Sequence, residues 1–350
     1  MAKEHSRRTR ILLIILILLA LLMLCGLLYV LRAVTQSPDR REVISEVPGV
    51  ELEFQAYGGS WGATLERPVD VAYDGENRIY VTVPGASRIV YFDRNGKDGQ
   101  IFVEDAYEPN HQRTDFDVLV PCGIDVADDG LIYVADTQKA AIVVFSPEGQ
   151  KLREFDLMGA KHVEVQAGRV YALSDTGKLV VLDTEGNRLG EWGTEGRGPD
   201  QLKDPNGVAV DADGNIYISD MDNYRVISLD PELEVRWRYG SPSFTNEEHT
   251  ARSLASPTGI TIGQDGYIYL TDSLSSVVQV LDSAGKIVSA PLGQMGNADD
   301  QFYFPSSIEC IDENLFVMAD TYHDRIVGVR LTHQEVAEDT QASSAATAAP

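Results

Sequence analysis

The chain has 350 residues, of which 43% are hydrophobic and 24% charged, and its formal net charge is −25. Such an acidic chain argues against nucleic-acid binding, because neutralising phosphates requires clustered Lys and Arg. Its three cysteines provide neither a disulfide framework nor a zinc motif.

The first predicted element is a membrane helix over residues 11–31. Lys3, Arg7, Arg8 and Arg10 precede this stretch, which contains no charged residue. At ~1.5 Å per residue it spans the ~30 Å hydrocarbon core, and it is longer than the ~7–15 residues of a cleavable signal. No small-residue cleavage site follows it. We therefore expect an uncleaved single-pass anchor in the cell membrane, with the basic residues inside and the rest of the chain extracytoplasmic.

Residues 32–49, which include Ser37, Pro38 and Pro48, have the composition of a linker. A lone strand is predicted over residues 50–57. From residue 332 to the end the chain is rich in Gln, Glu, Ser, Thr and Ala, which predicts a disordered tail.

Between these segments, over residues 50–331, a unit of about 40 residues recurs six times. Four copies place a Pro fifteen residues before an Asp, and the other two begin at Pro68 and near Ala160. The four pairs are Pro121 and Asp136, Pro205 and Asp220, Pro257 and Asp272, and Pro305 and Asp320. A period near 40 residues with several short strands per unit is typical of a β-propeller.

The repeated motifs are P-x-G-[VI], D-G-N-I-Y-[IV]-x-D and D-x-x-x-x-R-[VI], and residues 202–230 match them best. They resemble NHL repeats, and the resemblance covers about residues 50–331. It implies an all-β, six-bladed propeller, here preceded by the transmembrane helix. The sixth copy contains only three strands, so we expect the strand over residues 50–57 to complete blade six and close the ring.

One face of such a propeller collects the turns between the second and third strands and the connections between blades. We call it the ligand face, because the long insertions at residues 104–118, 194–204 and 241–256 all fall there. Its candidate binding residues are His111, Tyr224, His249, Tyr322 and His323. Tyrosines combine large contact area with a hydrogen-bonding hydroxyl and are favoured in binding sites.

The residue after each blade-start anchor is expected to line the mouth of the central channel. These residues are Val69, Cys122, Lys161, Asn206, Thr258 and Ser306, and the position four after the anchor adds Asp125, Glu164 and Glu309. Converging acids, together with Asn206, provide oxygen ligands of the kind that Ca²⁺ prefers. The alternative is a water-filled channel whose acids are hydrated.

Two enzyme families share this architecture by resemblance. Peptide-amidating lyases place zinc-binding histidines just after the blade-start Pro, where this chain offers only His162 nearby, and a catalytic zinc needs about three protein ligands. Lactonases of this shape hold a central Ca²⁺ with Glu, Asn and Asp, so Glu309, Asn206 and Asp125 keep that possibility open.

Other repeated residues have structural explanations. The Asp that ends each second strand is expected to cap a turn, and Arg225 and Arg325 stand five residues after such an Asp, where they can pair with it. Cys310 replaces a core aliphatic residue, and Cys122 and Cys310 are expected to remain unpaired.

The leading functional hypothesis is a membrane-tethered binding platform for a protein, peptide or glycan, acting through the ligand face. One alternative is a Ca²⁺- or Zn²⁺-dependent lyase or lactonase-type hydrolase with its site at the channel mouth. A second alternative is a scaffold subunit of a membrane complex. No other cofactor is indicated, since the chain lacks P-loop, Gly-x-Ser-x-Gly and haem-attachment motifs.

Overall fold

The computed structural model describes residues 49–60, 62, 64–104, 116–240 and 254–333. The predicted membrane helix, nearly all of the linker and of the tail, and both His111 and His249 lie outside these ranges. Within them, no helix is long and apolar enough to cross a membrane.

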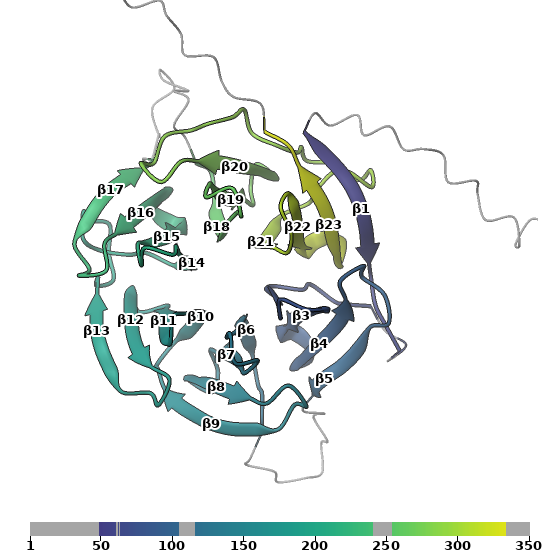
Figure 1. Ribbon diagram of the computed structural model, residues 1–350, viewed down its shortest axis with the longest axis horizontal. Coiled ribbons are helices and arrows are strands. Elements are labelled where there is room, and N and C mark those ends of the chain that lie inside the picture. The colour runs from purple at the N-terminus through teal and green to yellow at the C-terminus, as the bar shows by residue number, and fades with distance from the viewer. Residues whose placement is uncertain (1–48, 61, 63, 105–115, 241–253, 334–350) are drawn as a thin grey trace, which may run out of the picture. The chain divides into compact units, whose positions relative to one another are not determined.

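The described residues form six antiparallel sheets arranged as the blades of a propeller (Figure 1). Blade one contains β2 (Val71–Tyr73), β3 (Arg78–Val83), β4 (Arg88–Asp93) and β5 (Gln100–Glu104). Blade two contains β6 (Pro121–Val126), β7 (Ile132–Asp136), β8 (Ala141–Phe145) and β9 (Lys151–Asp156). Blade three contains β10 (Ala160–Gln166), β11 (Arg169–Ser174), β12 (Lys178–Asp183) and β13 (Arg188–Trp192).

Blade four contains β14 (Pro205–Val210), β15 (Ile216–Asp220), β16 (Arg225–Leu229) and β17 (Val235–Tyr239). Blade five contains β18 (Pro257–Ile262), β19 (Ile268–Asp272) and β20 (Val277–Leu281). Blade six contains β21 (Pro305–Cys310), β22 (Leu315–Asp320), β23 (Arg325–Leu331) and β1 (Val50–Ala56). Three short 3-10 helices occupy turns between second and third strands: η1 (Pro84–Ala86), η2 (Met221–Asn223) and η3 (Thr321–His323).

The ring closes where the first strand of the propeller meets the last. β1 is the outer strand of blade six and pairs antiparallel with β23, from Val50 opposite Leu331 to Ala56 opposite Ile326 (Figure 1). This confirms the prediction that the strand over residues 50–57 completes blade six. Pairing removes an open edge from β23 and joins the two ends of the propeller.

Blade five departs from the four-stranded pattern. Its sheet has three regular strands, and the following segment pairs with β20 only through bridges between Leu281 and Ile287 and between Val278 and Leu292. Pro291 lies between those bridges and has no N–H to donate to the ladder.

The hydrophobic core lies between the blades rather than within any one of them. Each of the six buried clusters in the described chain combines residues of two neighbouring blades; Tyr133 of blade two, for example, packs with Val163 of blade three. Every blade therefore buries apolar side chains on both faces, which is why no single repeat could fold alone.

The repeated Asp and Arg do pair, as predicted. Arg225 Nε lies 2.8 Å from Asp220 Oδ2, and Arg325 Nε lies 2.8 Å from Asp320 Oδ2, with both carboxylates fully buried. Arg225 also donates to the backbone oxygen of Gln201, 2.6 Å away. Each pair thus fastens a turn to the preceding inter-blade connection, which is a structural role.

Candidate functional site

Two separate cavities, both lined by described residues, lie along the central channel. The mouth cavity, of about 60 Å³, is lined by Val69, Asp70, Cys122, Lys161, His162, Asn206 and Ser306. The acidic cavity, of about 300 Å³, is lined by residues that include Asp125, Glu164, Thr261, Glu309, Asp128 and Asp211. The second set comes from the ends of the inner strands and from the tight turns that follow, so the acidic cavity lies on the side away from the ligand face.

The sequence had placed all these candidates at one channel mouth, and the structure divides them. Cys122, Lys161, Asn206 and Ser306 line the mouth cavity, whereas Asp125, Glu164 and Glu309 line the acidic cavity. Thr258 has a different role. It is buried, and its hydroxyl lies 2.8 Å from Ser273 Oγ and 3.3 Å from the oxygen of Pro305, so it links blades five and six.

Three carboxyl groups of the acidic cavity are hard to ionise. Burial, followed by repulsion from Asp125, raises the pKa of Glu164 and of Glu309 well above the usual range. Burial also raises the pKa of Asp125 to about 7, although the N–H groups of Val165 (2.6 Å) and Val126 (2.7 Å) donate to its carboxylate and oppose the shift. Desolvation is therefore the dominant effect.

These acids do not form a metal site in the described chain. No group of three or more His, Cys, Asp or Glu side chains among the residues placed by the structure is arranged to hold a metal ion. Asn206, the fourth candidate ligand, lines the other cavity. The residues present therefore do not fit the central Ca²⁺ that the resemblance to lactonases had left open, and neither do they fit a catalytic Zn²⁺.

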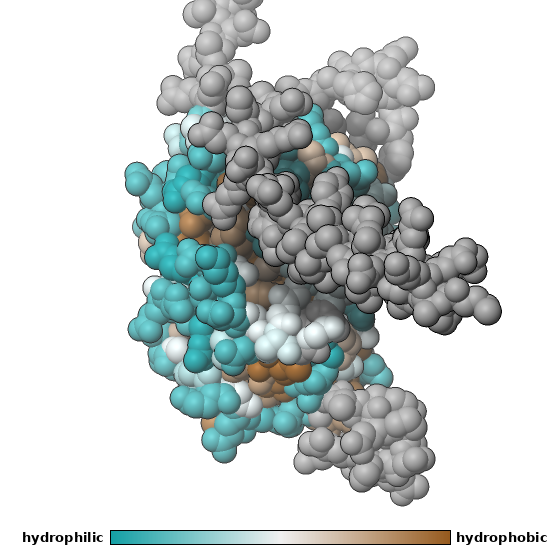
Figure 2. All heavy atoms as spheres, turned by 90° about the vertical axis from the view of Figure 1, so that its right-hand side faces the viewer, coloured by the Kyte–Doolittle hydropathy of each residue, from teal (hydrophilic) through white to brown (hydrophobic). Residues whose placement is uncertain are grey.

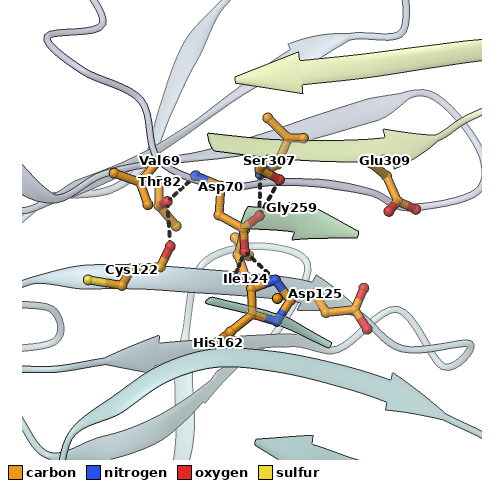
Figure 3. A network of polar contacts seen from close by, with 12 residues as sticks. Val69, Asp70, Thr82, Cys122, Ile124, Asp125, His162, Gly259, Ser307 and Glu309 are labelled. Carbon is orange, nitrogen blue, oxygen red and sulfur yellow. Dashed lines mark hydrogen bonds and ion pairs between the residues drawn. The ribbon is translucent and has the colours of Figure 1, made fainter. Parts of the chain in front are cut away.

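The mouth cavity is organised around Asp70 (Figure 3). This carboxylate accepts hydrogen bonds from the N–H groups of Val71 (3.0 Å) and Ile124 (2.9 Å) and from the hydroxyl of Ser307. Its Oδ2 also lies 3.3 Å from Nε2 of His162. Three donors and the His162 imidazole, from four different blades, thus converge on one buried carboxylate.

Asp70 escaped the sequence analysis, and His162 was considered only as an isolated zinc ligand, although a signal for their meeting was present. Both stand two residues after the blade start, where blades two, four and five have Gly123, Gly207 and Gly259. A Cβ on Gly123 would lie 2.5 Å from the Cα of His162, so the neighbouring inner strands approach too closely there for any side chain. The copies that depart from glycine are the ones whose side chains meet at the channel.

Cys122 does not form a nucleophile–base pair with His162. In Figure 3 its sulfur points away from the imidazole, and the hydroxyl of Thr137 donates to it from 3.3 Å. Burial raises the pKa of the Cys122 thiol, which disfavours the reactive thiolate. Cys310 is likewise unpaired and packs against the core between blades five and six, where burial raises its pKa to about 11.

Exposed apolar side chains concentrate on the ligand face. Nine large hydrophobic residues of the described chain are exposed, and three of them, Ile101, Leu152 and Leu189, lie on outer strands. The other six lie in turns between second and third strands or in connections between blades: Tyr57, Met158, Leu274, Met295, Tyr303 and Tyr322. None lies in a tight hairpin turn of the opposite face. On the side of the molecule that Figure 2 shows, the visible described surface is mostly hydrophilic, with small hydrophobic patches.

An aromatic cluster occupies the ligand face where blade six meets blade one. Tyr322 is 50% exposed, and its ring centroid lies 5.8 Å from that of Tyr303 and 4.9 Å from that of Phe304. The guanidinium of Arg67 lies 5.0 Å from the centroid of Tyr322. His323, whose Nδ1 is 2.7 Å from Asp320 Oδ2, packs against Tyr303. Tyr322 and His323 thus both pack against Tyr303 in this cluster. Tyr224 lies in the equivalent turn of blade four.

Twelve non-glycine residues spread over the described blades have positive φ values, and three of them stand directly before a blade-start proline. Arg67, Asp204 and Phe304 each directly precede a blade-start proline and adopt φ values of 61°, 51° and 54°. Such left-handed conformations are costly for residues other than glycine and often occur at functional sites. Two of these side chains belong to the aromatic cluster or touch it, and the third, Asp204, pairs with Lys161 at the mouth cavity.

Comparison with known proteins agrees with this architecture. Residues 202–227 match the family model of the NHL repeat. The chain is 24% identical over 228 residues to Protein SUPPRESSOR OF QUENCHING 1, chloroplastic, of Arabidopsis thaliana. That match covers 62% of this chain but only 19% of the relative, so the chain spans about a fifth of the relative's length.

Two enzymes are among the solved structures that resemble this propeller. Virginiamycin B lyase from Staphylococcus aureus has a TM-score of 0.55 at 12% identity, over 81% of this chain and 100% of that one. A gluconolactonase from Xanthomonas campestris has a TM-score of 0.56 at 12% identity, over 81% of this chain and 89% of that one. At such identities the likeness establishes the fold alone.

Proposed function

We propose that this six-bladed β-propeller of NHL type is a binding module that recognises a protein, peptide or glycan through its ligand face. The observation that carries the proposal is the placement of six exposed large apolar side chains on that face and none in the opposite tight turns. Contiguous exposed apolar surface commonly marks interaction sites, and two of the six side chains, Tyr303 and Tyr322, contact one another.

The aromatic cluster is the centre of the proposed site. Tyr and Trp, with Arg, dominate the binding energy of interfaces, because large rings exclude water and offer a polar atom. Tyr303, Tyr322 and Arg67 provide this combination at the seam of blades six and one.

The proposal includes attachment to the cell membrane through residues 11–31, with the propeller on the extracytoplasmic side. Its support is the length and lack of charge of that segment and the basic residues before it. A tethered module of this kind would bring its ligand to the membrane surface or scaffold a membrane complex.

A lyase or lactonase-type activity is the second candidate, favoured by the fold that the chain shares with such enzymes. It is weaker because the described channel residues include neither a set of metal ligands nor a nucleophile beside a base. Measuring tightly bound metal in the purified protein discriminates between the two classes: stoichiometric Ca²⁺ or Zn²⁺ would favour the enzyme.

The binding proposal is tested with matched pairs of variants. Partners are first captured from peptide and glycan libraries with the full-length protein. Tyr322→Ala and Leu274→Ala, both on the ligand face, should then weaken binding, with the loss of a central aromatic residue costing about 2 kcal/mol or more. Leu152→Ala is the control for Leu274→Ala, because Leu152 is similarly exposed but lies on the outer strand β9. Loss of binding in Leu152→Ala with retention in the other two would contradict the proposal.

A further inference from the structure

The exposed apolar side chains of the ligand face are concentrated in one sector of the ring. Of the six, Met158 alone lies away from blades five and six and the connections beside them. Blade six stands between blades five and one in the ring (Figure 1). The other five side chains are Tyr57, Leu274, Met295, Tyr303 and Tyr322.

Contacts join the turn that carries Leu274 to the aromatic cluster. The N–H of Phe304 donates to Ser276 Oγ, 3.2 Å away at the end of that turn. The ring of Phe304 packs against Tyr322, with 4.9 Å between the centroids, and the guanidinium of Arg67 lies over Tyr322. Leu274, Phe304, Tyr322 and Arg67 thus form a strip across the seams of three blades, here called the ligand strip, with an aliphatic residue at one end and a cation at the other.

Arg67 brings an uncommitted cation to the end of the ligand strip. Its guanidinium has no carboxylate or hydrogen-bond partner in the described chain, while its backbone N–H donates to Asp324 Oδ1 at 2.8 Å. Arg225 and Arg325, in contrast, are each paired with a buried Asp. A guanidinium that stacks on an aromatic ring keeps its planar fork of N–H donors available, and this fork matches the two oxygens of a carboxylate.

The chemistry of the ligand strip favours a peptide over a glycan. A sugar ring stacks on an open aromatic face, but the guanidinium of Arg67 already lies over Tyr322, and Phe304 packs against the same ring at an angle of 41°. The neighbouring Leu274 and Met295 are aliphatic and provide no aromatic face at all. They are suited instead to cover apolar side chains of a peptide.

On the basis of the proposed binding function, we infer that the partner is a peptide segment with an apolar side chain and a carboxylate a few residues apart. The apolar side chain packs on Leu274 and Phe304, and the carboxylate accepts hydrogen bonds from the guanidinium of Arg67. Because the whole chain carries a net charge of −25, an acidic peptide gains nothing from the overall charge. Its preference for this surface therefore depends on Arg67.

The test begins with a random decapeptide library displayed on phage, selected on the purified full-length protein. The bound peptides should be enriched in Asp or Glu near an apolar residue. The tightest binder is then compared with its version in which Gln replaces the acidic residue. The Gln version should bind about fivefold more weakly, the upper end for an exposed ion pair.

Variants assign this preference to one side chain. In Arg67→Gln the acidic peptide and its Gln version should bind equally well, whereas Arg67→Lys keeps the charge without the planar fork and should retain part of the preference. Arg169→Gln is the matched control and should keep the whole preference. Arg169 is also exposed, but it stands at the start of β11, beside a tight turn of the opposite face.

The outcomes separate this inference from the proposed function. A selection without acidic enrichment, or an Arg67→Gln variant that keeps the preference, would overturn the inference, while weaker peptide binding by Tyr322→Ala would still support the binding module. An array of neutral and uronic-acid oligosaccharides provides the other arm. Binding to these sugars and to no peptide would also overturn the inference alone, and binding to neither would overturn both proposals.

Discussion

Arg67 shows how a single residue can combine a conformational cost with a position in the proposed site. Its φ of 61° places a Cβ in the left-handed region, where glycine is the least costly residue, while its guanidinium stacks on the exposed Tyr322. Function and stability are therefore expected to have opposite preferences at this position.

This conflict predicts an unusual order of stabilities. Arg67→Gly and Arg67→Ala both remove the stacking side chain, but only glycine relieves the backbone, so the glycine variant should be more stable by about 0.5–1 kcal/mol. Thermal unfolding of the two variants measures the difference. Arg188 is the matched control, because it is exposed on β13 and its φ is not positive. There Arg188→Ala should be more stable than Arg188→Gly, because glycine weakens a strand. The same order at both positions would contradict the assignment of strain.

Glu164 carries a second prediction at this scale, because burial raises its pKa in the folded chain well above its ordinary value of 4.5. The folded state then holds a proton that the unfolded state has released, so the contribution of Glu164 to stability is complete below about pH 4.5 and is lost as pH rises through the folded pKa. The contribution of Glu309 to stability is likewise lost as pH rises, because its folded pKa is also raised. The same holds for Asp125, whose folded pKa is about 7.

Glu164→Gln, which keeps the shape but cannot ionise, should therefore be more stable than the parent at pH 8 and equally stable at pH 4.5. Urea unfolding midpoints at the two pH values measure this. Glu148→Gln, at an exposed turn residue, is the matched control and should show no such pH dependence. An unchanged difference between Glu164→Gln and the parent across this pH range would show that Glu164 is ionised in the folded protein.

At the scale of the elements, the closing strand β1 contributes to stability beyond its own length. It covers the edge of β23, and its Gln55 accepts a hydrogen bond from the buried Arg325 at 2.6 Å. Phe54 packs over Gly328, where a Cβ would lie 2.2 Å from its ring, so the fit leaves no room for a larger residue.

Removing β1 should accordingly destabilise the whole ring. A chain that starts at Gly59 loses the closure, and we expect it to unfold at a temperature at least several degrees below that of a chain starting at Arg41, since each ~1 kcal/mol shifts the midpoint by roughly 2–4 °C. Calorimetry or circular dichroism compares the two. Equal midpoints would mean that the pairing of β1 with β23 contributes nothing to stability.

The blades were predictable because most of them repeat the same local chemistry, and four combine a Pro at the start of the inner strand with an Asp at the end of the second strand. The irregular outer segment of blade five could not be predicted in this way, because the bridges at Ile287 and Leu292 depend on how the chain passes around Pro291. The division of the channel was missed for a related reason. Position along a strand gives the direction of a side chain, but Asp70 meets its partners from β6, β10 and β21 only once the ring is closed.

At the scale of the whole molecule, the location of the propeller is a prediction from residues 11–31. The protein should remain with membranes after an alkaline carbonate wash, and deletion of residues 1–31 should release it. Protease added to intact cells should remove the tail after residue 332. A protein that the wash extracts, or a tail that stays intact while an extracytoplasmic control is cut, would contradict this topology.

The pairing of β1 with β23 also has a consequence for synthesis. β1 leaves the ribosome first among the strands of the propeller and its partner leaves last, so blade six cannot form until nearly the whole domain has been made. Until then β1 is an unpaired strand able to pair with the β23 of another copy, which would join two rings by exchange of one strand. Crowded translation of one message therefore favours swapped dimers, whereas dilute refolding of the complete chain favours the closed monomer.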